Sequence, residues 1–284
     1  MFDALVSAFA SEAMQALLAA KPTEAGSWLD ETVIVNDEHR SILAWVRDLL
    51  LEQSYLARDE EAWRLTNSDL PPAEEIWRTL LAEYPEAMPE LILVGRMGHA
   101  LLPMLAGDLA PSALAANLRC SHQFETLFDD SITYRGSRLA VEQLLEALAR
   151  SLPANRRLRV LEIAAGLSEV PRQIGHRVPT DAIDYVLAHC DAEACDHLRH
   201  EYQDDDWISV AELESSPPAL KAKCSLPACY DVVVFRHSLT SVADHRAMLI
   251  WAKASLANGG LLVLAERHAD LAADLVWGAG RLAA

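Results

Sequence analysis

Glycines let a backbone approach a phosphate or a nucleoside closely, and a ligand cradle of that kind depends on them. This sequence of 284 residues has 11 glycines, roughly half the usual share. In the second half the candidates are Gly166, Gly175, Gly259, Gly260, Gly278 and Gly280. Any glycine-based cradle in this half must therefore be built from these few positions.

Histidine and cysteine side chains in the second half raise the question of a zinc site. They are His189, Cys190, Cys195, Cys224 and Cys229. Four residues separate the cysteines of each pair, whereas zinc knuckles place two residues between theirs. The spacing favours ordinary thiols, and we expect no metal site.

Five short apolar runs must position the polar residues of the second half. The runs are 157–165, 183–190, 207–213, 230–237 and 260–266. Their composition and bounding turns are typical of buried parallel strands, and a helix is predicted between the last two, at 244–256. Alternating strands and helices predict a doubly wound α/β sheet. Ligands bind such sheets at the carboxyl ends of the strands.

The first half of the sequence has the apolar periodicity of helices. Helices are predicted at 2–20, 38–53, 73–84, 91–105, 112–116, 125–128 and 137–151. Segment 55–65 alternates around a charged turn, like the β-wing of winged helices that bind DNA. Its charges are mostly acidic, so a packing role is favoured.

Composition excludes several classes of partner. The net charge of −18 argues against nucleic acid and against an anionic membrane, because each requires a basic surface. The longest apolar runs have the length of strands, so we expect no transmembrane helix. Segment 1–20 lacks the basic start of a signal peptide, and five cysteines is an odd number. Both features predict a cytoplasmic protein with reduced thiols.

Segment 161–168 reads L-E-I-A-A-G-L-S, which is similar to the L-E-I-G-A-G-T-G motif of class I S-adenosylmethionine-dependent methyltransferases. Further matches are at 80–91, 127–135, 230–246, 259–266 and 274–278. Over about 43–278 the chain resembles the C-methyltransferase domains of modular polyketide synthases. The resemblance implies a Rossmann-like methyltransferase sheet, preceded by an all-helical subdomain that forms a lid in an active enzyme.

The resemblance implies that S-adenosylmethionine would bind at the loop after the first strand. Glu162 and Gly166 match the motif, whereas Ala164 and Ser168 stand where the family has glycines. Each added Cβ at a close-approach position costs roughly 1 kcal/mol or more.

The family also has an acid at the end of the second strand, which binds the ribose hydroxyls. His189 stands at this position, and an imidazole cannot accept hydrogen bonds from both hydroxyls as a carboxylate does. Asp191, two residues further on, is the alternative acid.

The family's catalytic His–Glu dyad falls on Thr240 and Glu266. A neutral threonine cannot act as a general base near pH 7, so His237 is the possible substitute base. The family's Tyr–Asn pair near the substrate tunnel falls on Ser137 and Arg138. Glu266 also has a structural interpretation, as an ion-pair partner of a neighbouring arginine.

The organisation expected from these patterns is a helical subdomain at 1–155 and a methyltransferase core at 156–284. We expect this core to lack the antiparallel hairpin that closes the sheet in the family. The last strand, 260–266, would then be an unpaired edge. A neighbouring domain or a second copy of the chain could cover it.

Two functions remain open. The favoured one is a non-catalytic pseudo-C-methyltransferase of a polyketide synthase, without a cofactor, that has a structural or docking role beside the neighbouring synthase domains. The alternative is an active S-adenosylmethionine-dependent C-methyltransferase acting on β-ketoacyl thioesters held on an acyl carrier protein, or a repurposed catalyst in the same pocket. The replacements Ala164, Ser168, His189 and Thr240 favour the first function. The retained residues Gly166 and Glu266 favour the second.

Overall fold

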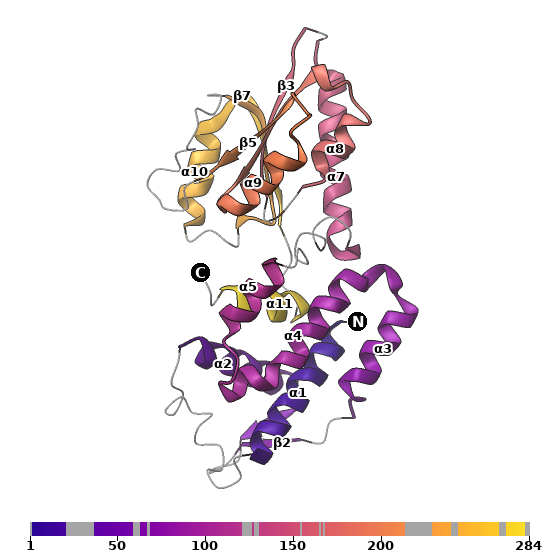
Figure 1. Ribbon diagram of the computed structural model, residues 1–284, viewed down its shortest axis with the longest axis vertical. Helices are drawn as coiled ribbons and strands as arrows, with labels where there is room; N and C mark the ends of the chain where they lie inside the picture. The colour runs from indigo at the N-terminus through magenta and orange to yellow at the C-terminus, as the bar shows by residue number, and fades with distance from the viewer. Residues whose placement is uncertain are drawn as a thin grey trace. The chain divides into compact units, whose positions relative to one another are not determined.

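The structure is a computed structural model, shown as a ribbon in Figure 1. It describes residues 2–20, 37–58, 63–66, 69–120, 127, 131–153, 155–164, 166, 168–213, 229–239, 244–266 and 271–281. The chain divides into two compact units. The first comprises Met1–Gln123 together with Ala269–Ala284, and the second is Phe124–His268.

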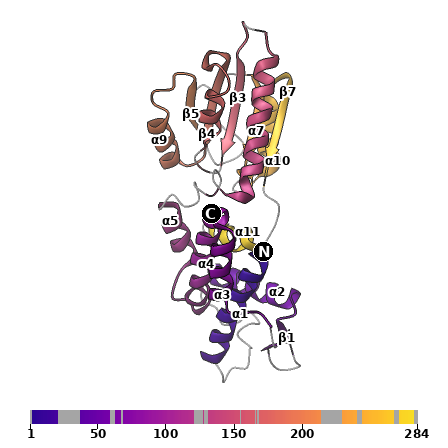
Figure 2. The ribbon, with the colours of Figure 1, turned by 90° about the vertical axis from the view of Figure 1, so that its right-hand side faces the viewer.

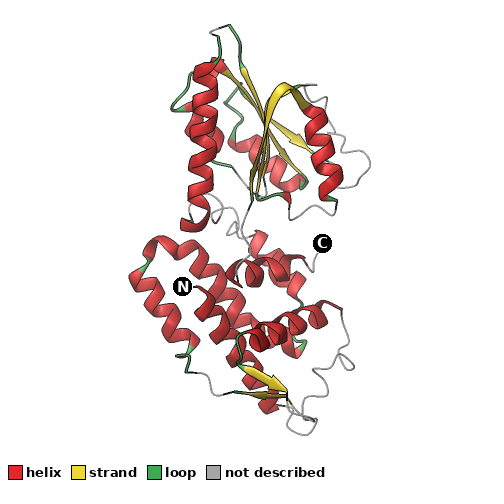
Figure 3. Cartoon of the chain, turned by 180° about the vertical axis from the view of Figure 1, so that it is seen from behind, coloured by secondary structure: helices red, strands yellow, loops and turns green. Residues whose placement is uncertain are grey.

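The first unit consists of helices and one small two-stranded sheet (Figure 3). Its elements are α1 (Phe2–Ala20), α2 (Asp37–Glu52), β1 (Leu56–Arg58), β2 (Trp63–Leu65), α3 (Ala73–Glu83), the 3₁₀ helix η3 (Pro85–Ala87), α4 (Met88–Ala106), α5 (Pro111–Cys120) and α11 (Leu271–Arg281). The helices predicted at 2–20, 38–53 and 73–84 are confirmed to within one residue at either end. The helix predicted at 125–128 lies outside the described residues except for Leu127.

α1 is the central helix of this unit. It is long and apolar enough to span a membrane, as judged from length and composition alone. It packs against α2, α3, α4 and α11, and its buried face includes Leu5, Phe9 and Met14. We therefore interpret α1 as the core helix of a folded unit.

α4 approaches α1 and α3 closely because it has glycines at the contacts. A Cβ at Gly98 would overlap the ring of Phe9 on α1, and one at Gly95 would lie 2.8 Å from Nε1 of Trp77 on α3. Trp77 also donates a hydrogen bond from Nε1 to the carbonyl oxygen of Leu91, at 2.8 Å. Side-chain volume at these two positions is therefore restricted.

The predicted β-wing is confirmed as an antiparallel pair in which Leu56 lies opposite Leu65 and Arg58 opposite Trp63. Leu56 is buried, and the guanidinium of Arg58 lies 5.3 Å from the centre of the Trp63 ring. Both contacts are structural, in agreement with a packing role.

The second unit is a five-stranded parallel sheet with helices on both faces, which confirms the predicted fold class (Figure 2). Its elements are α7 (Ile132–Ser151), β3 (Leu158–Ala164), α8 (Val170–Gly175), η4 (Thr180–Ala182), β4 (Ile183–His189), α9 (Ala192–Glu201), β5 (Ile208–Glu212), β6 (Tyr230–Arg236), α10 (His245–Ser255) and β7 (Leu256–Ala265). The strand order is β5-β4-β3-β6-β7. The chain reverses its direction of winding between β3 and β6, so their carboxyl ends form the switch point of the sheet.

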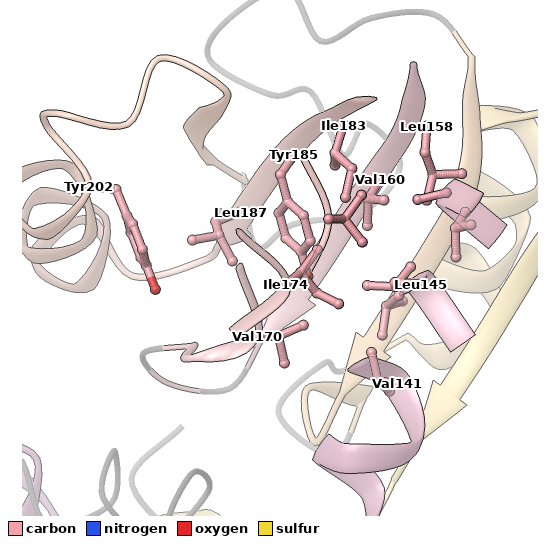
Figure 4. Packing of buried hydrophobic residues seen from close by; sticks show 14 of the residues in the cluster. Val141, Leu145, Leu158, Val160, Val170, Ile174, Ile183, Tyr185, Leu187 and Tyr202 are labelled. Carbon is pink, nitrogen blue, oxygen red and sulfur yellow. The ribbon is translucent and has the colours of Figure 1, made fainter. Parts of the chain in front are cut away.

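Two hydrophobic clusters hold the sheet between its helices. On one face, side chains of α7, α8 and α9 pack against Val160, Tyr185 and neighbouring residues of β3, β4 and β6 (Figure 4). On the other face, Met248 and Ala252 of α10 pack against side chains that include Phe235. Because both faces are covered, the central strands are apolar at nearly every position.

α7 begins at Ile132, five residues earlier than the predicted start. The Ser131 hydroxyl oxygen caps it by accepting a hydrogen bond from the Tyr134 amide at 3.2 Å. α7 packs against α8 and β7, so it belongs to the sheet unit although it precedes residue 155. α11 follows the sheet in the sequence but packs against α1, α4 and α5. The two compact units therefore do not follow chain order, because packing assigns α7 to the sheet and α11 to the helices.

We predict that Gly98→Ala destabilises the protein by about 1–3 kcal/mol, because the added methyl group must displace the Phe9 ring. Gly136→Ala in α7 is the matched control. A Cβ at Gly136 meets nothing within 4 Å, so alanine should raise stability by up to about 1 kcal/mol. Urea denaturation of both variants measures the difference, and equal stabilities would contradict the packing of α4 against α1.

Candidate functional site

The sequence-predicted site residues that the structure describes lie at or next to the carboxyl edge of the sheet. Ala164 ends β3 and pairs in register with Arg236 at the end of β6, which in turn pairs with Ala265 of β7. His189 ends β4 and follows Ala188, the register partner of Ile163. These strand ends surround the switch point, where parallel sheets bind ligands.

A buried ion pair lies directly beneath this edge. The Glu162 side chain is fully buried, and its Oε1 accepts a hydrogen bond from Nε of Arg236 at 2.8 Å. Arg236 is 1% exposed. Oε2 of Glu162 accepts a second hydrogen bond from the Tyr185 hydroxyl at 2.6 Å. The arginine thus neutralises the buried carboxylate, and the arginine and the phenol supply its hydrogen bonds away from water.

Ser168 completes the shell around Glu162. Its hydroxyl lies 2.9 Å from both carboxylate oxygens and also accepts a hydrogen bond from the Val170 amide at 3.3 Å. The Ser168 carbonyl oxygen accepts a hydrogen bond from the Tyr202 hydroxyl. The residue at a glycine position of the methyltransferase motif therefore anchors its loop to β3 and to the end of α9.

The two tyrosines of this network remain protonated donors. Burial raises the pKa of Tyr185 well above its ordinary value, and the neighbouring Glu162 carboxylate raises it further. Burial also raises the pKa of Tyr202, with a further contribution from Glu201. Neither phenol can ionise near neutral pH, so both donate hydrogen bonds throughout the physiological range.

The described positions at the start and middle of the loop after β3 are buried, whereas Glu169 at its end is partly exposed. Ala164 is 5% exposed, Ser168 is 2% exposed and Gly166 is also buried. Ala165 and Leu167 lie outside the described residues.

His189 and Asp191 are engaged with the backbone at the start of α9. Nδ1 of His189 accepts a hydrogen bond from the Asp191 amide at 2.9 Å, so the neutral imidazole carries its proton on Nε2. Oδ1 of Asp191 caps the helix by accepting from the amides of Glu193, at 2.8 Å, and Ala194, at 3.4 Å. The position of the family's ribose-binding acid thus offers a ring N–H, and the alternative acid is used as a helix cap.

His237 and Glu266 lie at the neighbouring ends of β6 and β7. The His237 amide donates to the carbonyl oxygen of Ala265 at 3.0 Å, and Oε1 of Glu266 accepts from the Leu239 amide at 3.1 Å. The structure therefore brings the substitute base and the retained carboxylate to adjacent strand ends. Thr240 lies outside the described residues.

The His237 side chain is held by α7. Its ring packs edge-on against Tyr134 with the ring centres 4.6 Å apart, and Nε2 lies 3.4 Å from Oγ of Ser137. Ser137 donates its own proton to the Tyr134 carbonyl oxygen at 2.7 Å, so His237 is the donor to Ser137. The backbone φ of 56° at His237 is uncommon for a residue other than glycine, which indicates a tightly constrained strand end.

Arg138, which matches the family's Tyr–Asn pair together with Ser137, has a structural partner. It forms an ion pair with Glu142 one turn further along α7. Glu142 is fully buried and also pairs with Arg177 at 3.0 Å. This cluster ties α7 to the segment after α8.

The cysteines of the described residues do not form a metal site. Cys195 is buried, its thiol lies 3.5 Å from the His189 carbonyl oxygen, and burial raises its pKa to about 11. Cys190 and Cys229 are exposed, and Cys224 lies outside the described residues. Within the described chain, no three His, Cys, Asp or Glu side chains are grouped so as to hold a metal ion.

The sequence analysis missed the roles of Arg236, Tyr185 and Tyr202. A signal for Arg236 was present, because it is a cation that directly follows the apolar run Val232–Phe235, and Glu162 is an anion between Leu161 and Ile163 of the neighbouring strand. Two opposite charges in adjacent buried strands indicate an ion pair. The tyrosines carry no such signal, since a buried tyrosine is common in any core.

No protein-family model matches the chain. Over 283 residues it is 20% identical to the non-reducing polyketide synthase ausA of Aspergillus calidoustus, a match that covers 96% of the chain and 11% of the synthase. The chain thus spans about a tenth of that protein.

Three solved structures share the fold over nearly the whole chain. The CurJ carbon methyltransferase has a TM-score of 0.78 at 20% identity, with 97% of this chain and 75% of that chain covered. The DszA carbon methyltransferase has a TM-score of 0.79 at 16% identity, with 99% and 74% covered. The CMeT domain of the citrinin polyketide synthase has a TM-score of 0.77 at 16% identity, with 98% and 75% covered. The chain therefore has the fold of carbon methyltransferases, and the predicted Rossmann-like methyltransferase architecture is confirmed.

We predict that Arg236→Met destabilises the protein by about 3–5 kcal/mol, because it leaves the Glu162 carboxylate buried without its counter-charge. The double variant Arg236→Met with Glu162→Gln should lose less, since no uncompensated charge remains. The control is Arg199→Met, whose exposed ion pair with Asp196 should contribute no more than about 1 kcal/mol. Urea unfolding at pH 7 gives the three values, and similar losses for Arg236→Met and Arg199→Met would contradict a closed buried network.

Proposed function

We propose that this chain is a methyltransferase-like domain of a polyketide synthase that no longer transfers methyl groups and has a structural or docking role. The observation that carries the proposal is that protein side chains already bind both carboxylate oxygens of Glu162. The donors are Arg236, Tyr185 and Ser168. All of these donors belong to the protein itself. The carboxylate of the cofactor motif is therefore engaged without a ligand.

The residues at the strand ends do not fit S-adenosylmethionine. The described loop positions Ala164, Gly166 and Ser168 are buried rather than open to a ligand. His189 presents a single ring N–H where a carboxylate would accept from two hydroxyls, and Asp191 is used as a helix cap. We therefore expect no bound cofactor and derive no methyl-transfer step.

The synthase setting is the second part of the proposal. It is supported by the match to the Aspergillus calidoustus synthase and by the fold shared with the citrinin synthase domain. Neighbouring synthase domains and their acyl carrier protein are then the partners, and the cytoplasm is the location. The net charge of −18 supports neither a nucleic-acid nor a membrane partner.

One observation favours the alternative of a working C-methyltransferase on acyl-carrier-bound β-ketoacyl thioesters, or of a repurposed catalyst. His237 and Glu266 lie on adjacent strand ends, as a base and its partner would. Against this, Nε2 of His237 donates to Ser137 and its ring packs on Tyr134. The imidazole is thus held by α7, which favours a structural role for His237.

We predict that the purified protein shows no saturable binding of S-adenosylmethionine up to about 1 mM, an affinity worth only about 4 kcal/mol. Isothermal titration calorimetry is the measurement. The matched comparison is the triple variant Ala164→Gly, Ser168→Gly and His189→Asp, which restores the family residues. A micromolar dissociation constant for the unmodified protein, or cofactor retained through purification, would overturn the proposal.

We also predict that Thr240→His alone does not yield methyl transfer. The substitution restores the family's base but leaves the cofactor site unchanged. The effects on catalysis of residues that act as a unit are not additive, so one restored residue should not restore activity. The readout is mass spectrometry of a β-ketoacyl substrate on an acyl carrier protein, incubated with S-adenosylmethionine. Methylated product from this single variant would mean that the cofactor site is intact. Product from the unmodified protein would assign the base to His237.

A further inference from the structure

The loop after β3 is held at Ser168 by two separate contacts. The Ser168 hydroxyl lies 2.9 Å from both oxygens of Glu162 and accepts a hydrogen bond from the Val170 amide at 3.3 Å. The Ser168 carbonyl oxygen accepts a hydrogen bond from the hydroxyl of Tyr202, the residue that follows α9. A side chain from another helix therefore holds the loop at the strand end, where parallel sheets bind ligands.

Tyr202 can hold the loop only while its ring keeps its position. The ring is 4% exposed and belongs to the hydrophobic cluster that includes Val170 and Leu187 (Figure 4). Its single hydroxyl lies at the far end of a rigid ring, so the hydrogen bond to Ser168 depends on where the ring lies. Whatever fixes the Tyr202 ring therefore also fixes the loop.

Arg172 of α8 lies over this ring, with its guanidinium carbon 5.7 Å from the ring centre. Its Nη1 donates a hydrogen bond to Oε1 of Glu169 at 2.6 Å, and its Nη2 donates to Oε1 of Glu201 at 2.7 Å. Glu169 directly precedes α8, and Glu201 is the last residue of α9. One planar guanidinium thus bridges the two helix ends and covers the Tyr202 ring.

The three charged side chains of this clamp are partly open to solvent. Those of Arg172, Glu169 and Glu201 are 42%, 32% and 22% exposed, whereas Ser168 and Tyr202 are buried. Dissolved salt screens partly exposed ion pairs strongly, and it acts much less on a buried hydrogen bond. Solvent can therefore act on the buried contact between Tyr202 and Ser168 through the clamp.

We propose that the clamp controls the opening of the loop after β3. Arg172 is a positioning residue that holds the Tyr202 hydroxyl against the Ser168 carbonyl oxygen, and weakening its ion pairs releases the loop. Because salt screens these pairs, the loop should open more often at high ionic strength. The clamp acts in this way whether or not the site binds a cofactor, so the proposal does not depend on the proposed function.

The test is hydrogen exchange of the Val170 amide, followed by NMR on the full chain at low salt. Arg172→Met should speed this exchange about fivefold to tenfold, because it removes two partly exposed ion pairs and the contact with the ring. Tyr202→Phe keeps the ring and removes only the hydroxyl, and it should speed the same exchange. The control Arg199→Met removes an exposed ion pair with Asp196 on α9 and should leave Val170 unchanged.

The double variant separates this role from a general stabilising one. If Arg172 acts through Tyr202, then Arg172→Met should add little to the effect of Tyr202→Phe. Raising the salt from about 0.05 to about 1 M should speed exchange at Val170 in the unmodified protein but not in Arg172→Met. Additive effects of the two substitutions, or an Arg172→Met variant with unchanged exchange at Val170, would overturn the proposal. So would an equal change at Val233 in β6, because Arg172 would then act on the whole sheet.

Discussion

The buried ion pair between Arg236 and Glu162 fixes the arrangement of the carboxyl edge of the sheet. A carboxylate inside a protein must be neutralised and hydrogen-bonded, and here β6 supplies the charge while β4 and the loop after β3 supply the other donors. Ser168 adopts its position because its hydroxyl contacts Glu162 and its carbonyl oxygen accepts from Tyr202. Hydrogen bonds between protein groups therefore link the ends of β3, β4 and β6 to the loop after β3.

Under the proposed function, this network holds the methyltransferase fold together without methyl transfer. The hydrophobic clusters on both faces of the sheet hold the strands together independently of any ligand. Side chains then supply at the switch point the contacts that tie the loop to the sheet. Asp191 and His189 likewise accept hydrogen bonds from the backbone at the start of α9. The packing that stabilises the sheet therefore does not depend on the residues that stand at the strand ends.

The architecture could be predicted because burial in strands and helices leaves recognisable patterns of apolar residues in the sequence. Runs such as Tyr230–Phe235 identify buried parallel strands, and apolar periodicity identified α1, α2 and α3. The start of α7 depended on the Ser131 cap rather than on periodicity and was predicted too late. The replaced positions Ser168 and His189 were recognisable, but their new partners were not. The Tyr202 partner of Ser168 lies 34 residues away in the chain, and Glu162 lies 74 residues from Arg236, so only the folded register brings these groups together.

The central claim is that Arg236 occupies the site through its contact with Glu162. The most direct measurement is ¹⁵N NMR of the Arg236 Nε–H group, assigned by its loss in Arg236→Lys. We predict a slowly exchanging signal, because the group is buried and bonded at 2.8 Å, and we predict no change on addition of about 1 mM S-adenosylmethionine. A rapidly exchanging signal, or one that shifts as the cofactor is added, would contradict the account.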